Sequence, residues 1–297
     1  MTFVTAASVE EAVEAMAGGA RPVAGGTDLV VGARQGKAPL PDKLVAIHRV
    51  DALRGITGSG EGLRLGALVT HAEIADHPVV RERFTALADA SAIVGSHATR
   101  AHGTIGGNVM NASPAMETGG PLVCFDATVT LLSLSGSRRV AVSDLFAGPG
   151  STIALPGELL TTVDIPAAIA GMGSCYLRLE YRRQMEIAVV GVTAAVTLDA
   201  GRVTEAMIAI TALAPSIRRV PEAECALVGS DGGRAAAVAA AQAVATASAP
   251  ISDVRASADY RRAMSAVIAR RAVQAAVRRA GGGHVPVPAS PFLHGDL

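Results

Sequence analysis

Two glycine-rich segments carry the residue types best suited to holding a phosphate-containing ligand. The first is Gly25-Gly26-Thr27-Asp28, which directly follows an apolar run, and the second is Thr104-Ile105-Gly106-Gly107-Asn108. Because glycine has no Cβ, its backbone can approach an anion closely, and successive N–H groups can surround it. Taken singly, each segment could equally be an ordinary structural turn. The pair, however, predicts one elongated ligand with a diphosphate between two walls.

Neither segment is a Walker loop, because no Lys follows the paired glycines. The cysteines Cys124, Cys175 and Cys225 lack C-x-x-C spacing and a nearby His, so we expect small buried hydrophobic residues and no metal ligand. The histidines also lack the spacing of a metal site, although His102 precedes the second segment and could reach a phosphate. We therefore assign no catalytic residue and no metal site.

The composition excludes several classes of partner. The chain has 26 basic and 26 acidic residues, so it lacks the excess of positive charge that nucleic-acid binding needs. The N-terminal residues lack the basic region of a signal peptide. The longest uncharged stretch, 235–252, is too weakly hydrophobic to span a bilayer. We expect a cytoplasmic protein with no membrane span.

The 297 residues divide into three predicted lobes and a tail. The boundaries are 1–55, 56–172 and 173–284, and the Pro-rich residues 285–297 are expected to form a mobile tail.

Turn and periodicity signals place the elements within these lobes. The first lobe is predicted to contain a helix over 9–17, capped by Ser8, and strands at 21–24 and 44–47. In the second lobe we expect, in order, a strand at 63–68, a helical stretch over 71–93 interrupted at Pro78, a hairpin of 122–134 with 138–142, and a strand at 161–165.

The third lobe is predicted to contain a long hairpin, 189–198 with 203–213, followed by two helices. The last helix, 259–279, has apolar side chains at helical spacing that predict its buried face. These are Tyr260, Met264, Val267, Ile268 and Ala272.

Ala24 to Leu29 and Thr104 to Asn108 together resemble the FAD-binding loops of the flavoprotein subunits of molybdenum hydroxylases, the xanthine dehydrogenase and carbon monoxide dehydrogenase family. The resemblance covers nearly the whole chain, and the spacing of the loops agrees. The segment Tyr181 to Ala188 is similar to the family's Arg-Arg…Asp-Ile-Ala segment, and Ser257 to Arg262 resembles the start of its C-terminal helix.

The resemblance implies an α+β fold. Two N-terminal α/β lobes of the FAD-binding PCMH type, the second with an antiparallel sheet, would grip an extended FAD. A C-terminal lobe of antiparallel sheet with a helical bundle would follow.

The resemblance also implies an electron-transfer role within a larger assembly. In this family the substrate is oxidised at a molybdenum cofactor in a large subunit, and two iron–sulfur clusters in a small subunit pass electrons to the flavin. The acceptor would be NAD, a quinone or oxygen, and the assembly a dimer of heterotrimers, that is, a heterohexamer.

Carried over residue by residue, the resemblance gives Glu117 a contact with the cofactor, lets Ile187 pack over the isoalloxazine, and places Arg178 close to the flavin. Glu117 and Glu186 stand where the family more often has Asp, and Glu186 could instead form a salt bridge with Arg182 or Arg183. The residues that the resemblance places around FAD are Val23, Ala24, Gly25, Gly26, Thr27, Asp28, Leu29, Val30, Val94, His102, Thr104, Ile105, Gly106, Gly107, Asn108, Glu117, Leu160, Arg178 and Ile187.

Two other classes of function remain open at this point. The first is a stand-alone FAD-dependent reductase or oxidase of the same fold, such as the enolpyruvyl-glucosamine reductase type, which would need its own substrate pocket and proton donor. The second is a non-enzymatic nucleotide-binding module whose two loops hold a ligand other than FAD.

Overall fold

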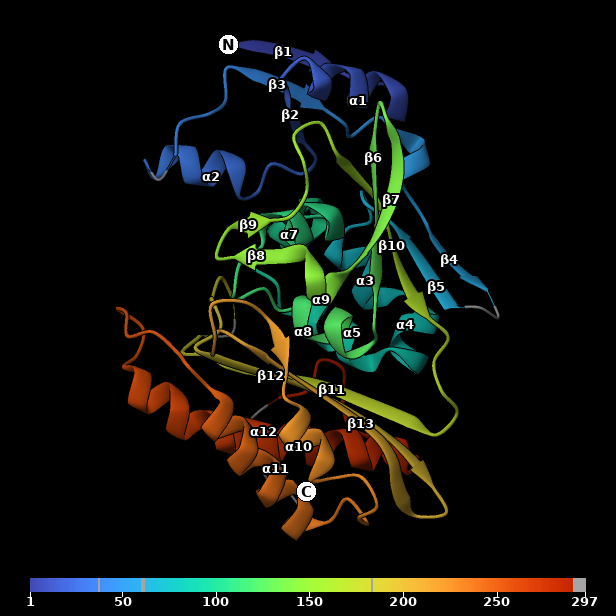
Figure 1. The fold of residues 1–297 in the computed structure, drawn as a ribbon, viewed down its shortest axis with the longest axis vertical. Coiled ribbons are helices and arrows are strands. Elements are labelled where there is room, and N and C mark those ends of the chain that lie inside the picture. Colours follow the sequence, from blue (N-terminus) through green and yellow to red (C-terminus); the bar gives the residue numbers. More distant parts are fainter. Residues whose placement is uncertain (37, 60–61, 183, 291–297) are drawn as a thin grey trace.

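The computed structural model describes residues 1–36, 38–59, 62–182 and 184–290. Within this part of the chain, three larger sheets follow one another along the longest axis of the molecule, in the order of the sequence (Figure 1). The α+β fold expected from the resemblance is confirmed. The division into lobes at residues 55 and 172 stays a prediction.

The first sheet is parallel, with the strand order β1-β3-β2. Its strands are β1 (Thr2–Thr5), β2 (Arg21–Val23) and β3 (Lys43–Ala46), and helix α1 (Val9–Ala17) connects the first two. The Oγ atom of Ser8 accepts a hydrogen bond from Glu11 N at 3.2 Å, which caps α1 at the predicted residue. Helix α2 (Leu29–Arg34) has no buried residue. A short 3-10 turn, η1 (Asp51–Leu53), ends the lobe.

The second sheet is antiparallel, with the order β4-β5-β10-β6-β7. Its strands are β4 (Ile56–Ser59), β5 (Gly62–Gly66), β6 (Thr128–Ser133), β7 (Gly136–Ala141) and β10 (Leu159–Pro166). The helices are α3 (His71–Asp76), α4 (Pro78–Arg83), α5 (Thr85–Ala92), α6 (His97–His102), α7 (Ile105–Asn111), α8 (Gly119–Cys124) and α9 (Val142–Leu145). A small hairpin of β8 (Phe146–Gly148) and β9 (Ser151–Thr152) lies against helices α7 and α9.

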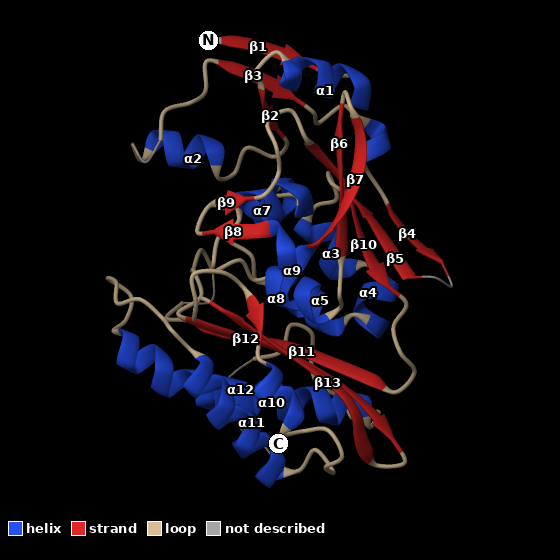
Figure 2. Cartoon of the chain, viewed as in Figure 1, coloured by secondary structure: helices blue, strands red, loops and turns tan. Residues whose placement is uncertain are grey.

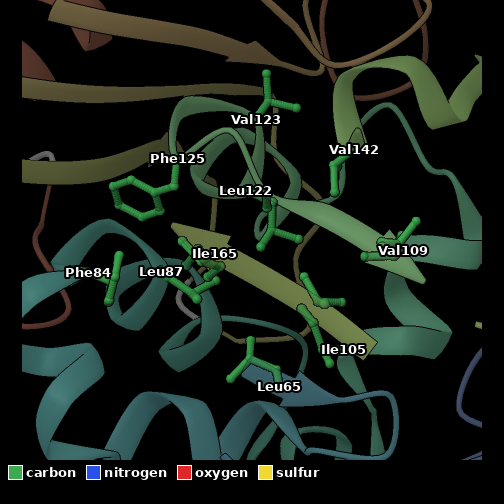
Figure 3. Close-up of a cluster of buried hydrophobic side chains, with 14 of the residues drawn as sticks. Leu65, Phe84, Leu87, Ile105, Val109, Leu122, Val123, Phe125, Val142 and Ile165 are labelled. Carbon is green, nitrogen blue, oxygen red and sulfur yellow. The ribbon is translucent and has the colours of Figure 1, made fainter. Parts of the chain in front are cut away.

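Apolar side chains from these strands and helices form one core. In Figure 3, Leu65 and Ile165 of the sheet point toward Leu87 of α5, Ile105 of α7 and Leu122 of α8. Helix α7 contains most of the second glycine-rich segment, and the packing of Ile105 in this core fixes the position of that segment.

The third sheet is antiparallel, with the order β11-β12-β13-β14. Its strands are β11 (Met172–Leu179), β12 (Val190–Asp199), β13 (Arg202–Thr211) and β14 (Arg218–Arg219). Helices α10 (Pro221–Cys225), α11 (Arg234–Ala247) and α12 (Ala258–Ala280) follow. Helix α12 packs on one side of the sheet, and α5 and α8 of the second lobe pack against β11, β12 and β13 (Figure 2). The third sheet therefore lies between helix α12 of the third lobe and helices α5 and α8 of the second lobe.

Several expectations from the sequence were wrong. Residues 122–124 belong to helix α8 and not to a strand, because the paired glycines before them allow this helix to lie close to the third sheet. A Cβ on Gly120 would lie 2.4 Å from Thr193 Oγ1. Cys225 is exposed, whereas Cys124 and Cys175 are buried as expected.

The buried face of α12 agrees with the prediction at Ile268 and Ala272 and differs from it in the first turns of the helix. Tyr260 is exposed, whereas Arg261 and Ser265 are buried together with Ile268. Arg261 is held inside because it donates hydrogen bonds to the carbonyl of Val189 and to a carboxylate. A pattern of apolar residues alone cannot identify a buried, paired cation.

The beginning of the expected mobile tail is packed. Val285 and Ala289 are buried against the C-terminal lobe, and Arg279 donates hydrogen bonds to the carbonyls of Val285 and Pro286. Residues 291–297 lie outside the described residues. No helix in the described part of the chain is long and apolar enough to cross a membrane.

A buried ion pair joins the second lobe to the third. Asp89 of α5 is fully buried, and its carboxylate accepts hydrogen bonds from Arg279 of α12 at 2.6 and 3.1 Å. The same carboxylate accepts the N–H groups of Tyr176 at 3.2 Å and Ala289 at 2.9 Å. One side chain thus connects a helix, a strand and the tail.

We expect Asp89→Ala to lower the free energy of unfolding by about 3–5 kcal/mol, because it leaves the Arg279 guanidinium buried without a counter-charge. Urea unfolding followed by circular dichroism measures the change. The control is Asp259→Ala, which removes an exposed partner of Arg262 and should cost about 1 kcal/mol or less. Equal effects of the two substitutions would contradict the central role of Asp89.

Candidate functional site

The first glycine-rich segment forms the turn between β2 and α2. Gly26 has a φ of 69°, in the left-handed region that favours glycine. A Cβ on Gly25 would lie 1.8 Å from the carbonyl oxygen of His102, the last residue of α6. The first segment is therefore in direct backbone contact with the end of α6, two residues before the second segment, and this contact requires glycine at position 25.

The backbone of the first segment has N–H groups that could donate hydrogen bonds to a ligand. Within the described residues, the N–H groups of Gly25, Gly26 and Thr27 donate no backbone hydrogen bond. Three successive N–H groups of this kind suit an anionic ligand. Gly25 is exposed, and Val23, Ala24, Gly26 and Thr27 are half-buried, so the turn is accessible from the solvent.

The second segment is built differently from the first. Its N–H groups are used by the protein itself: Ile105 donates to the carbonyl of Val69 at 2.8 Å and Gly106 to that of Ala67 at 3.0 Å. A Cβ on Gly106 would lie 2.8 Å from the Cβ of Ala67, so this glycine permits close packing. The expectation that this backbone forms a second nest of free donors is wrong for these two residues.

The accessible part of the second segment is its far end. Thr104 is the N-cap of α7, and its Oγ1 accepts a hydrogen bond from Gly107 N at 3.1 Å. Of the five residues, Gly107 is exposed and Asn108 is half-buried. Asn108 Oδ1 accepts a hydrogen bond from Thr118 Oγ1 at 2.6 Å, which fixes the amide. The accessible surface of this segment is therefore formed by Gly107, and its accessible polar side chain is that of Asn108.

A buried arginine lies where the third lobe meets the second. Arg178 of β11 is 1% exposed. Its Nη1 donates to Glu117 Oε1 at 2.6 Å and to the carbonyl of Glu186 at 3.2 Å, and its Nε donates to Glu180 Oε2 at 2.5 Å. The remaining nitrogen, Nη2, is buried with no hydrogen-bond partner in the described part of the molecule. A buried donor without a partner is costly, so this atom is suited to receive a ligand acceptor.

Arg178 is a cation despite its burial. Burial acts to lower its pKa, but the neighbouring Glu117, Tyr176 and Glu180 outweigh this effect and raise the pKa above its usual value. Glu117, which the resemblance places against the cofactor, therefore has a second role as the counter-ion of Arg178.

The segment after β11 crosses the second lobe near the turn between α5 and α6. Met185 N donates to the carbonyl of Gly95 at 2.9 Å. Glu186 forms an ion pair with Arg182 at 3.5 Å, which confirms the pairing considered from the sequence, whereas Arg183 lies outside the described residues. Ile187 is 45% exposed, so an apolar surface is available there for stacking.

The remaining predicted residues fall into two groups. Val94 is half-buried and His102, Asp28 and Val30 are exposed, whereas Leu160 is enclosed in the core of the second lobe with Ile105. The side chains of Leu160 and Ile105 therefore belong to the scaffold.

Sequence reasoning missed two residues behind the second segment. His71, at the start of α3, is 1% exposed, and its backbone N–H donates to the carbonyl of Gly103 at 3.1 Å. Arg100 of α6 is nearly buried and donates to the carbonyl of Val94 at 3.0 Å. Their positions within an ordinary helical pattern give no signal in a single sequence. The described residues contain no group of three or more His, Cys, Asp or Glu side chains that could hold a metal ion.

Comparison with known proteins identifies the ligand class of this site. A family described as the FAD binding domain in molybdopterin dehydrogenase matches residues 1–168, and one described as the CO dehydrogenase flavoprotein C-terminal domain matches residues 176–276. The fold and the site thus define an FAD-binding protein.

Individual relatives match most of the length of this chain. The chain is 32% identical over 284 residues to the 6-hydroxypseudooxynicotine dehydrogenase complex subunit alpha of Paenarthrobacter nicotinovorans, covering 94% of this chain and 95% of that one. It is 32% identical over 264 residues to the carbon monoxide dehydrogenase medium chain of Afipia carboxidovorans, covering 88% and 90%.

Solved structures agree. Carbon monoxide dehydrogenase from Hydrogenophaga pseudoflava, in a form that lacks the Mo-pyranopterin moiety, superimposes with a TM-score of 0.90 at 30% identity, covering 94% of this chain and 98% of that one. The chain belongs to the family of FAD-binding oxidoreductase subunits of molybdenum hydroxylases, of the carbon monoxide dehydrogenase and xanthine dehydrogenase type. The resemblance and the FAD cofactor are confirmed.

The buried His71 makes the support of the second segment sensitive to acid. Burial, with a smaller contribution from Arg100, lowers the pKa of His71 from 6.5 to about 4. The unfolded chain therefore binds more protons than the folded protein between these two values. The free energy of unfolding should fall as the pH is lowered from 6.5 to about 4, by up to ~3 kcal/mol from this group.

Urea unfolding of the protein and of His71→Gln across that pH range tests this expectation. The substitution should remove most of the pH-dependent loss, whereas His102→Gln, at an exposed position, should leave it unchanged. An unaltered pH profile in His71→Gln would show that other groups cause the acid sensitivity.

Proposed function

We propose that this chain is the electron-transfer subunit of a multi-subunit molybdenum hydroxylase. It would take electrons from iron–sulfur clusters of a small partner subunit and pass them to an external acceptor, either NAD, a quinone or oxygen. Substrate would be oxidised at a molybdenum cofactor on a large partner subunit. The observation that carries the proposal is the backbone contact of Gly25 with His102, which sets the free N–H groups of the first segment against the second lobe.

The described residues fit FAD in three respects. Gly25 to Thr27 offer unused N–H groups for the diphosphate, Gly107 and Asn108 offer an accessible polar surface, and Arg178 has an unpartnered Nη2. We assign cofactor binding to the segments 23–30 and 104–108 and to Val94, His102, Glu117, Leu160, Arg178 and Ile187. Of these, Leu160 and Ile105 support the site from the core, where their side chains are enclosed.

When it is bound, the flavin accepts electrons singly or in pairs and releases them again. The residues of this chain bind and orient it. Glu117 and Glu180 fix the Arg178 guanidinium on two sides, so its Nη2 keeps one direction. Ile187 offers an exposed apolar side chain on a segment anchored at Gly95. No residue of the site needs to act as a general acid or base, and we assign no catalytic residue.

The names of the relatives support partner subunits. They are a medium chain and a subunit of a dehydrogenase complex, and this chain covers 90% or more of the length of both. We propose a large subunit with the molybdenum cofactor and a small subunit with two iron–sulfur clusters, arranged as a dimer of heterotrimers.

The purified full chain is expected to carry FAD, seen as flavin absorption and as FAD released on denaturation. Gly25→Ala should abolish this binding, because its Cβ would clash with the carbonyl of His102 and separate the two segments. Gly32→Ala in α2 is the matched control, since a Cβ there meets no atom within 4 Å. If Gly25→Ala retains as much FAD as the wild type, the assignment of the site is wrong.

Co-expression with its partner subunits tests the place of the chain in an assembly. The chain should co-purify with a molybdenum-containing subunit and an iron–sulfur subunit, and the flavin should be reduced by substrate only in the complete complex. Turnover of substrate by this chain alone would favour a stand-alone reductase or oxidase instead.

A further inference from the structure

Arg100 differs from the other buried arginines of the described chain. It is 8% exposed, its Nη1 donates to the carbonyl of Val94 at 3.0 Å, and its Nη2 is 3.0 Å from His97 Nδ1. Neither of these two partners is a carboxylate. Within the described residues, no carboxylate lies within ion-pair distance of Arg100.

The other buried arginines each have an acidic partner. Arg178 pairs with Glu117 at 2.6 Å, and Arg261 pairs with Asp253 at 2.7 Å. Buried charges are usually paired because removing a lone charge from water is costly. An unpaired buried cation therefore indicates that the protein keeps the charge for a partner or a function outside its own fold.

Among the charged groups around Arg100, the cation Arg178 has a larger effect than the carboxylate Asp76. Burial, then repulsion from Arg178, lowers the pKa of Arg100, while Asp76 acts in the opposite direction with a smaller effect. The adjacent His71 is neutral near pH 7, because its pKa is about 4. The charged groups that act on Arg100 are thus one further cation and one carboxylate that is not within ion-pair distance.

Arg100 is also attached to the proposed cofactor site. It holds the carbonyl of Val94, the residue before Gly95, whose own carbonyl accepts the N–H of Met185. Gly95 has a φ of 51°, so this turn has a backbone conformation that depends on its supports. The Arg100 guanidinium therefore contacts the same turn, at Val94, that accepts the Met185 N–H at Gly95.

We propose that Arg100 is an electrostatic residue of the cofactor site, whose unneutralised charge favours the reduced over the oxidised flavin. This inference rests on the proposed function. Uptake of two electrons and one proton gives the flavin one more negative charge than it had when oxidised. The electrons come from the iron–sulfur partner, the proton comes from solvent, and a nearby fixed cation favours the added charge.

The test is the midpoint potential of FAD bound to the full chain, measured by equilibration with a reference dye. Arg100→Gln keeps a donor for Val94 and removes the charge, so reduction should become about tenfold less favourable, which is about 30 mV for a two-electron couple. Arg100→Lys keeps the charge and should retain most of the wild-type potential.

Arg81→Gln is the matched control. Arg81 likewise donates from Nη1 to the carbonyl of the residue six positions earlier, Ala75, at 3.1 Å, but it is exposed. Its substitution should leave the potential unchanged.

Three results would overturn the proposal in favour of a purely structural role. These are an unchanged potential in Arg100→Gln, equal shifts in the Gln and Lys variants, and loss of FAD from both variants. Absence of FAD from the wild-type chain would instead refute the proposed function, so the two failures are distinguishable.

Discussion

The fully buried carboxylate of Asp89 is the interaction on which the arrangement of the lobes depends. It accepts hydrogen bonds from Arg279 of α12, from the backbone of β11 at Tyr176 and from the tail at Ala289. Strand β11 is thereby fixed against α5, and Arg178 follows two residues after Tyr176 on the same strand. The position of Arg178 against Glu117 is thus a consequence of how the second and third lobes are joined.

The two glycine-rich segments resemble each other in sequence and differ in physical role. In the first, glycine allows the backbone to lie on His102, and three successive N–H groups donate no backbone hydrogen bond to any described residue. In the second, the N–H groups of Ile105 and Gly106 donate to the carbonyls of Val69 and Ala67, which follow β5. Gly106 also allows α7 to pack closely on Ala67. One segment provides donors for an anion, and the other provides a rigid wall with an accessible polar end.

Much of the framework could be predicted from the sequence, because it depends on local signals. The Ser8 cap, the break at Pro78 and the turn between residues 198 and 203 are encoded by a few neighbouring residues, and the element boundaries next to them agree with the structure to within one residue. Features that depend on long-range contacts could not be predicted. The strand expected over 122–124 is a helix because Gly120 allows close packing on a distant strand.

The same limit applies to the site. The paired glycines were visible in the sequence, but the burial of His71 and Arg100 accompanies the packing of α3 against α6, which no local pattern shows. Arg261 was hidden for a related reason, since its partner Asp253 and the carbonyl of Val189 come together only in the folded lobe. The spacing of apolar residues predicts which face of a helix is buried, but it does not predict which charged side chains form ion pairs.

The attachment of the tail sets a limit on how short the protein can be made. The C-terminal family match ends at residue 276, and the last predicted lobe ends at 284. A chain cut at the first boundary would lack Arg279, and one cut at the second would lack the Ala289 N–H, so each would leave Asp89 with fewer donors. A shortened form for crystallisation or for fusion to another protein should therefore extend at least through Ala289, although the boundaries of the recognised domains would suggest an earlier end.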